Sequence, residues 1–308
     1  MNTPATVLCP IDFSDASRGA LRYARAIVEH FGGRLIILTV EDPLLAEAID
    51  LGSGIIRDPE ETRKELADFT ARAFAGRLSK GVDVNLEVAV GKPANEILRM
   101  AERQRCDLIV MSTHGLTGAR KLFFGSTTER VLRETTVPVL ATPATDNGPE
   151  DLEQARRIIS RILVPVDLTA ASSRQVLIAS GLAQALDVQL IVTYVVEPVR
   201  SPLAAKLHLH SIELERRGRA EDALRDLVAT VPPQLHPEAL VVYGDPAEEI
   251  SKAARDRHAG LILLGLHGSP MLGPRMGSVT YRVLCLTSAL VLALPPAPLS
   301  TEIQVAVS

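Results

Sequence analysis

Aromatic residues are scarce in this chain of 308 residues, which has no tryptophan, 4 tyrosines and 6 phenylalanines. Few side chains are therefore available on which nucleic-acid bases could stack. There is also no excess of positive charge, since 33 lysines and arginines stand against 37 aspartates and glutamates and the formal net charge is -4. A protein that neutralises many phosphates usually carries such an excess. Both shortages argue against a nucleic-acid-binding protein.

Long apolar runs are missing as well. The longest contain about six residues, at 35–40 and 261–266, whereas a membrane-spanning helix needs about 20. Met1 is followed by Asn2, Thr3 and Pro4, which is not the basic and then apolar pattern of a secretory signal. We therefore expect no membrane partner and a cytoplasmic protein.

Cysteine is rare too, with Cys9, Cys106 and Cys285 far apart and among apolar neighbours. An odd number at such spacing fits neither a disulfide framework nor a CxxC metal site. Because free cysteine behaves as a small apolar residue, we expect three buried, reduced thiols.

The chain contains the same pattern twice. Its length allows about two domains, and matching segments recur at nearly constant offsets of 152 to 155 residues. The matches are Pro10-Ile11-Asp12 with Pro165-Val166-Asp167, 91–97 with 244–250, 108–115 with 261–268, and Gly125-Ser126 with Gly277-Ser278. Such spacing indicates duplication of a whole domain. We expect domains at 1–145 and 159–308, joined by a polar linker at 146–158.

Each copy alternates short apolar runs with stretches of helical length. Near-continuous apolar strands are typical of a parallel sheet covered on both faces. The sequence thus predicts two tandem doubly wound, five-stranded α/β domains. The expected strands are residues 6–11, 35–40, 83–90, 108–111 and 137–141 in the first copy, and 161–166, 189–195, 238–242, 261–264 and 289–294 in the second.

One carboxylate follows the first strand of each copy, Asp12 and Asp167. Ligands of an open α/β sheet collect beyond the carboxyl ends of its strands, where the topology switches direction. These aspartates are therefore candidate ligand-binding residues. The alternative is a turn or capping residue for the helix that begins near Ser14 or Asp15.

A glycine-containing loop follows the fourth strand of the first copy. Gly115 and Gly125 would allow a ligand to approach the backbone closely. The segment Ser126-Thr127-Thr128-Glu129 has the spacing of a capping box, which predicts a helix N-terminus at the end of the loop. Such a terminus binds anions, most often phosphate. An ordinary flexible loop is the alternative, because neither GxxxxGK[ST] nor GxGxxG after the first strand is present.

The pattern Ser112-x-x-Gly115-(nine residues)-Gly125-Ser126, with Pro10-Ile11-Asp12 and Gly91-x-Pro93, resembles the universal stress protein family. Nucleotide-binding members of that family read Gly-x2-Gly-x9-Gly-Ser/Thr, so Ser112 replaces the first glycine. The resemblance covers essentially the whole chain as a tandem member. It implies a Rossmann-like fold of the adenine nucleotide alpha hydrolase-like type.

The resemblance implies an ATP site in the first copy, with Mg carried on the phosphate oxygens. The ends of the first two strands would hold adenine and ribose, and the glycine loop and helix start would receive the phosphates. His114 would either close over the phosphates or hydrogen-bond the loop. The implied residues are Pro10, Ile11, Asp12, Val40, Met111, Ser112, His114, Gly115, Gly125, Ser126 and Thr127.

A second, non-equivalent ATP site is implied in the other copy. Only eight residues separate Gly268 from Gly277, Pro270 and Pro274 stiffen this interval, and the capping-box acid is missing. The implied residues are Pro165, Val166, Asp167, Val195, Gly265, His267, Gly268, Gly277, Ser278 and Val279.

The predicted function is ATP-dependent regulation of the stress response through association with partner proteins. No catalytic base stands out, so any hydrolysis would be slow. The alternatives are an ATPase using Asp12 and His114, and a nucleotide-independent scaffold or binder of an apolar metabolite. The apolar last strand of each copy is a poor exposed edge. We therefore expect an internal pseudo-dimer, and a homodimer of chains is possible.

Overall fold

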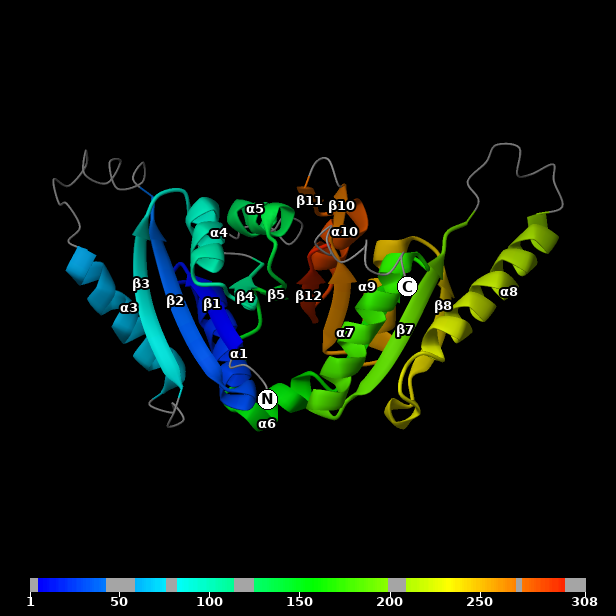
Figure 1. The fold of residues 1–308 in the computed structure, drawn as a ribbon, viewed down its shortest axis with the longest axis horizontal. Coiled ribbons are helices and arrows are strands. Elements are labelled where there is room, and N and C mark those ends of the chain that lie inside the picture. Colours follow the sequence, from blue (N-terminus) through cyan, green and yellow to red (C-terminus); the bar gives the residue numbers. More distant parts are fainter. Residues whose placement is uncertain are drawn as a thin grey trace, which may run out of the picture. The chain divides into compact units, whose positions relative to one another are not determined.

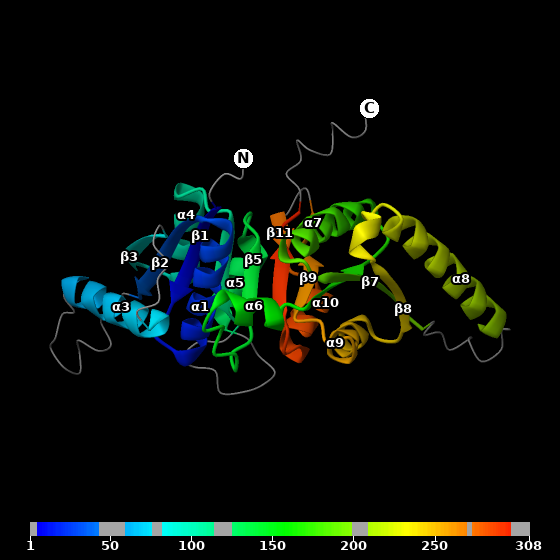
Figure 2. The ribbon, with the colours of Figure 1, turned by 90° about the horizontal axis from the view of Figure 1, so that it is seen from below.

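A computed structural model describes residues 5–42, 59–75, 82–113, 125–198, 209–269 and 273–296. By its contacts the chain divides into two compact units. The first holds the chain up to Ala155 together with Leu266–Met276, and the second holds Arg156–Gly265 and Gly277–Leu294. The ribbons of both are drawn in Figures 1 and 2.

Five parallel strands form the sheet of the first unit, in the order β3-β2-β1-β4-β5. They are β1 (Ala5–Ile11), β2 (Gly33–Glu41), β3 (Asp83–Val90), β4 (Leu108–Ser112) and β5 (Val139–Thr142). The helices are α1 (Asp15–Phe31), α3 (Pro59–Phe74), α4 (Pro93–Arg103) and α5 (Ser126–Glu134). Helices α1 and α3 pack against each other, as do α4 and α5. Right-handed crossovers place these pairs on opposite faces of the sheet.

The second unit repeats this arrangement in the order β12-β9-β6-β7-β8. Its strands are β6 (Arg161–Val166), β7 (Gln189–Val196), β8 (Glu238–Tyr243), β9 (Leu261–Gly265) and β12 (Leu290–Leu294). Its helices are α7 (Ala170–Leu186), α8 (Leu209–Val228), η2 (Pro233–Leu235), α9 (Pro246–Asp256) and α10 (Ser278–Leu286). The predicted fold, two doubly wound domains in tandem, is confirmed.

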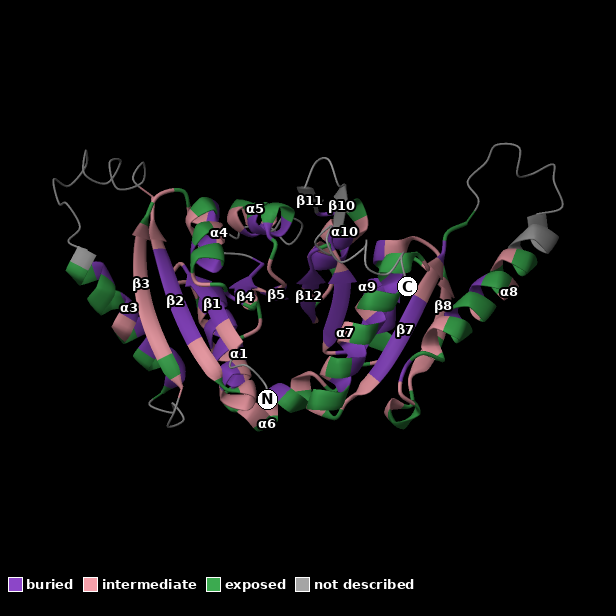
Figure 3. Cartoon of the chain, in the orientation of Figure 1, coloured by how far each residue is buried: buried purple, intermediate pink, exposed green. Residues whose placement is uncertain are grey.

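Burial follows the position of each strand in its sheet. The inner residues of β1, from Val7 to Cys9, are fully buried, because helices cover both faces of a central strand. The edge strand β3 is mostly half-buried and its last residue, Val90, is 60% exposed. Figure 3 shows this gradient from the inner strands to the edge.

The turn before α4 explains one motif of the sequence. Gly91 has a φ of 148° and its counterpart Gly244 a φ of 144°, a region that disfavours other residues. The carboxylate-bearing side chains of Glu96 and Glu249 lie close to these glycines. The repeated Gly-x-Pro turn is therefore required by backbone geometry in both copies.

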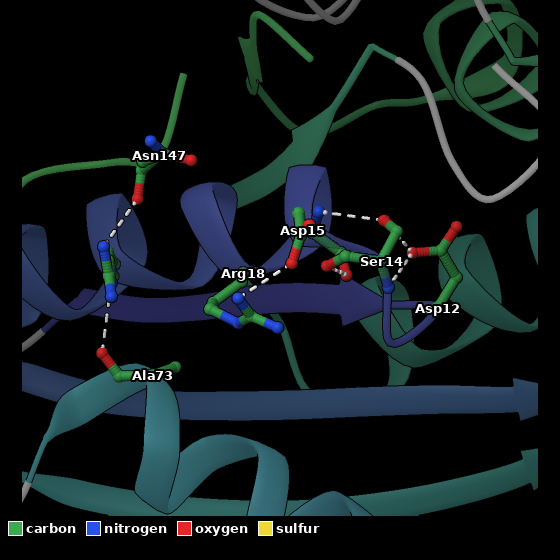
Figure 4. A network of polar contacts seen from close by, with 8 residues as sticks. Asp12, Ser14, Asp15, Arg18, Ala73 and Asn147 are labelled. Atoms are coloured by element: carbon green, nitrogen blue, oxygen red, sulfur yellow. Dashed lines mark hydrogen bonds and ion pairs between the residues drawn. The ribbon is translucent and has the colours of Figure 1, made fainter. Parts of the chain in front are cut away.

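The segment expected as a linker has structure of its own, since α6 (Leu152–Ile158) lies within it. Its first residues are bound to α1. Tyr23 Oη donates to Asp146 Oδ2 at 2.6 Å, and Arg22 donates from Nη1 to the Asn147 carbonyl at 3.0 Å and from Nε to the Ala73 carbonyl at 3.2 Å. Figure 4 shows the two carbonyls of Ala73 and Asn147 joined by this side chain.

The three cysteines form no disulfide. Cys9 and Cys106 are buried as predicted, but Cys285 is half-buried, so its predicted full burial is wrong. Cys285 lies in the last turn of α10, one residue before Leu286, which is itself 41% exposed. Among the helices that the structure describes, none has the length and apolarity needed to cross a membrane.

Candidate functional site

The candidate site of the first copy lies where the carboxyl ends of β1 and β4 meet. These strands pair directly although they are not consecutive in the chain, so the sheet switches direction between them. Ile11 ends β1 and Asp12 follows it, while Met111 and Ser112 end β4. In the next strand of the sheet, Val40 is the last residue but one of β2. The described parts of the predicted site thus reach the same edge of the sheet.

The start of α5 is tied to the end of β4 by two hydrogen bonds. The Gly125 N–H donates to the Thr113 carbonyl at 2.8 Å, and Thr128 Oγ1 donates to the Ser112 carbonyl at 2.9 Å. Thr128 is buried. These bonds fix the positive end of the helix macrodipole at the carboxyl end of the sheet.

The predicted capping box of Ser126 and Glu129 is wrong. Gly125, which has no side chain with which to cap, is the N-cap, and Ser126 is the first helical residue. The tie between Gly125 and Thr113 starts the helix one residue earlier than the box requires, and the Glu129 carboxylate instead accepts from Arg133 at 2.7 and 3.0 Å.

The missing cap has a consequence for ligand binding. The first N–H groups of a helix have no partner within the helix. With no side-chain cap at Gly125, the amides of Ser126 and Thr127 in the first turn are available to an anion. Ser126 is exposed and Thr127 half-buried, so an anion can reach them.

Asp12 organises the turn into α1. Its Oδ1 accepts from the Ser14 N–H at 3.1 Å and from Ser14 Oγ at 2.5 Å, as Figure 4 shows. Ser14 Oγ in turn accepts from the Ser17 N–H at 3.1 Å and caps the helix. Between them Phe13 has a φ of 63°, an unusual value for a bulky residue. Asp12 therefore stabilises the turn before α1, and binding of a ligand by Asp12 stays a prediction.

The second copy builds the same turn. Asp167 Oδ1 accepts from the Thr169 N–H at 3.0 Å and from Thr169 Oγ1 at 2.6 Å, and Leu168 has a φ of 58°. Pro165 and Val166 end β6 beside it, and in the neighbouring strand Val195 is the last residue but one of β7. The recurrence of the aspartate is thus explained by the turn alone, with or without a ligand.

The start of α10 resembles that of α5. Gly277 is the N-cap and has no side chain with which to cap the helix. The amides of Ser278 and Val279 are the first two of α10. Thr280 Oγ1 donates to the Gly265 carbonyl, but at 3.4 Å. This bond is longer than its 2.9 Å counterpart from Thr128 to Ser112, and a hydrogen bond weakens with length.

Between Gly265 and Gly277 the structure describes two short strands, where the sequence predicts an open loop. Strands β10 (His267–Ser269) and β11 (Gly273–Arg275) pair antiparallel, with Gly268 opposite Pro274. In the first copy, His114 and Gly115 lie outside the described residues.

Three threonines of the site were not predicted: Thr113, Thr128 and Thr280. Thr128 and Thr280 recur at the same offset of 152 residues as the Gly-Ser pairs before them, so a closer comparison of the two copies would have found them. A threonine hydroxyl in the first turn of a helix can reach the preceding strand. Within the described ranges, no cluster of three or more His, Cys, Asp or Glu side chains could hold a metal ion.

The model of the universal stress protein family matches residues 5–143 and again 159–295. The chain belongs to the universal stress protein family. The repeated match confirms a tandem member with two family domains.

Curated universal stress proteins match over the length of one domain. Universal stress protein MJ0531 of Methanocaldococcus jannaschii is 33% identical over 138 residues, which cover 44% of this chain and 79% of that protein. Universal stress protein MJ0577 of the same organism is 28% identical over 148 residues, covering 44% of this chain and 91% of that protein. The crystal structure of a universal stress protein from Archaeoglobus fulgidus covers 96% of this chain and 100% of its own, with a TM-score of 0.62 and 18% identity. The similarity to the Archaeoglobus fulgidus structure supports the fold.

Proposed function

We propose that this universal stress protein binds an adenine nucleotide, ATP, in its first copy and regulates the stress response through partner proteins. The triphosphate would lie at the start of α5, and adenine and ribose would lie at the ends of β1 and β2. Magnesium would be held by the phosphate oxygens. The protein would act in the cytoplasm, with its internal pseudo-dimer, or a homodimer of chains, presenting surfaces to those partners.

The anchored, uncapped start of α5 is the observation that carries this proposal. A phosphate site needs N–H groups that point outward and do not move. The bonds from Gly125 to Thr113 and from Thr128 to Ser112 hold the helix start, while the lack of a side-chain cap leaves its amides to a ligand. In a helix whose first N–H groups are bonded to a capping side chain, those groups are no longer available to a phosphate.

The remaining residues have roles that follow from their places. Pro10, Ile11 and Val40 would form the apolar wall of the base site, and Asp12 would accept a hydrogen bond from ribose while holding the turn. Ser126 and Thr127 would bind phosphate through their amides. His114 and Gly115 would complete the phosphate loop.

The first test asks whether the chain carries a nucleotide at all. Freshly purified protein is boiled, and the supernatant is assayed for adenine nucleotides by chromatography. Nucleotide-free protein is then titrated calorimetrically with ATP and magnesium. The proposal would be refuted if boiling released no adenine nucleotide and calorimetry detected no binding at millimolar ATP.

The second test places the site. We expect Gly125→Val to weaken ATP binding at least tenfold, or about 1.4 kcal/mol, because its side chain would stand against the phosphates. Gly277→Val makes the same change at the N-cap of α10 and controls for the loss of helix stability. A folded Gly125→Val variant with unchanged affinity would show that α5 is not the phosphate site.

A further inference from the structure

The connection that follows β5 covers one face of α1. Gly148 and Pro149 of this connection are buried. A β-carbon added to Gly148 would lie 2.3 Å from the Gly19 carbonyl oxygen and 2.8 Å from Cβ of Arg22. Arg22 and Tyr23 also donate hydrogen bonds to the connection. This face of α1 is therefore occupied by a later segment of the same chain.

The corresponding face of α7 is exposed. Helices α1 and α7 begin and end at the same offset of 155 residues, so the covered face of α1 corresponds to Arg174, Leu177 and Ile178. Arg174 is exposed, Leu177 is 72% exposed and Ile178 is half-buried. In the described part of the chain, Leu177 thus lacks the cover that its counterpart has on α1.

The exposed face of α7 is also more apolar than that of α1. Arg174 is the one charged residue in the sequence of α7, whereas α1 contains both acidic and basic residues. Leu177 and Ile178 stand where α1 has the arginine and the tyrosine that donate to the connection. Because aliphatic side chains donate no hydrogen bonds, a segment that covers α7 has to be bound by apolar contact.

Residues 297–308 are the counterpart of the connection that covers α1. Pro143 follows β5 and Pro295 follows β12 at the offset of 152 residues, so the chain leaves both last strands through a proline, whose φ is fixed. The same offset relates residues 146–150 to 298–302. Residues 297–308 lie outside the described part of the chain.

The composition of residues 297–308 matches the exposed face of α7. The segment has one charged residue, Glu302, whose charge is opposite in sign to that of Arg174. The corresponding connection over α1 is polar, as is the face of α1 that it covers. The large aliphatic residues of the segment are Leu299, Ile303, Val305 and Val307.

We infer that the exposed face of α7 is the docking site of residues 297–308 of the same chain. Docking removes Leu177 and Ile178 from water together with the aliphatic side chains of the segment, which is favourable. Each copy then holds the chain that leaves its last strand against its first helix, by polar bonds in the first copy and by apolar contact in the second. The inference does not depend on nucleotide binding.

Hydrogen–deuterium exchange of the full chain, followed by mass spectrometry, tests the docking. In one variant, residues 297–308 are replaced by glycine and serine at unchanged length. Helix α7 then loses its cover and opens more readily. Its amides should exchange about tenfold faster than in the unaltered chain, since burial of a leucine contributes at least that factor. Helix α1 keeps its own connection and serves as the internal reference.

A substitution in the face itself tests direct contact. Leu177→Gln should accelerate exchange in α7 about as much as the glycine–serine replacement, and should add little to it, because the contact is already lost there. Glutamine is used because its helix propensity is close to that of leucine. Leu214→Gln is the matched control, since Leu214 is 56% exposed on α8, and it should leave α7 unchanged. Circular dichroism confirms that each variant is folded.

Three outcomes would overturn the inference. The first is equal exchange of α7 in the unaltered chain and in the glycine–serine variant. The second is protection of α7 that rises with protein concentration and survives replacement of residues 297–308, because a second copy of the chain would then be the occupant. The third is an effect of Leu177→Gln that is the same with and without the segment.

Discussion

Gly19 shows how one residue can be fixed by a segment more than a hundred residues away in the sequence. A β-carbon at this position would lie 2.1 Å from the Asp146 carbonyl oxygen. The obstacle is backbone, and the backbone there is held by the bonds of Asp146 and Asn147 to α1. By contrast, Gly181 of α7 is exposed, with nothing within 4 Å of an added β-carbon.

These two helical glycines make a matched pair. We expect Gly19→Ala to lower the free energy of unfolding by about 1–3 kcal/mol through overpacking. Gly181→Ala should raise it by about 0.5–1 kcal/mol, because alanine favours helix and nothing obstructs it. Urea unfolding of both variants measures the difference, and equal effects of the same sign would contradict the close approach at Gly19.

The three cysteines differ in how far solvent can reach their thiols. Burial raises the pKa of Cys9 far above its ordinary value, and burial also raises the pKa of Cys106, to about 11. A raised pKa keeps a thiol protonated at pH 8, and the thiolate is the reactive form. We therefore expect Ellman's reagent at pH 8 to modify half-buried Cys285 in the folded protein and the other two only after denaturation. Rapid reaction of all three in the native chain would disagree.

At the scale of elements, the helix starts depend on different polar groups in the two copies. Ser14 caps α1 with its hydroxyl and donates that hydroxyl to Asp12. Thr169, at the start of α7, donates to Asp167 but caps nothing. Asp167 also accepts a hydrogen bond from Ser172 Oγ. The turn before α7 would keep this bond if the Thr169 hydroxyl were lost.

This difference predicts unequal losses. Ser14→Ala should destabilise the protein by about 1 kcal/mol, the usual cost of a lost N-cap, and Thr169→Ala by less. Thermal unfolding compares the two. A larger loss for Thr169→Ala would mean that its hydroxyl has a role beyond the bond to Asp167.

Most elements could be predicted from the sequence because strands of a covered parallel sheet must be apolar. Eight of the ten expected strands begin and end within two residues of their observed bounds for this reason, and the expected strands at 83–90 and 161–166 coincide with β3 and β6. The expected start of α1 is confirmed at Asp15 with Ser14 as N-cap. By contrast, α6 is short and polar, so no periodicity indicated it.

The site could be predicted only in outline. Residue order placed Asp12 and Ser112 at one edge of the sheet, because parallel neighbours end together. The N-cap could not be placed correctly, since Ser126-Thr127-Thr128-Glu129 fits a capping box and only the bond from Gly125 to Thr113 decides otherwise.

For the whole molecule, the connection between the copies contributes to the first unit. Arg25 is 2% exposed and donates to the carbonyls of Glu150 and, at 3.3 Å, of Phe74. With the bonds of Tyr23 and Arg22, three side chains of α1 hold this connection. The domain boundaries at 145 and 159 stay predictions, but residues 146–150 belong energetically with α1.

Replacing residues 146–150 by glycine and serine in the full chain tests this view. Hydrogen bonds of charged groups contribute about 1.5–3 kcal/mol each, so amide hydrogen exchange in α1 should accelerate at least about tenfold. Among the described residues no side chain of α7 donates to residues 146–150 as those of α1 do, so α7 serves as an internal control. Unchanged exchange in α1 would show that the connection is dispensable.

The bond between the Gly125 N–H and the Thr113 carbonyl joins the start of α5 directly to the end of β4. A helix start that is bonded to the strand end in this way keeps its position whatever the length of chain between the two residues. Insertions and deletions between them need not disturb the sheet or the helix. Duplicated copies of such a domain are free to drift apart in the ligand they accept while they keep one common scaffold.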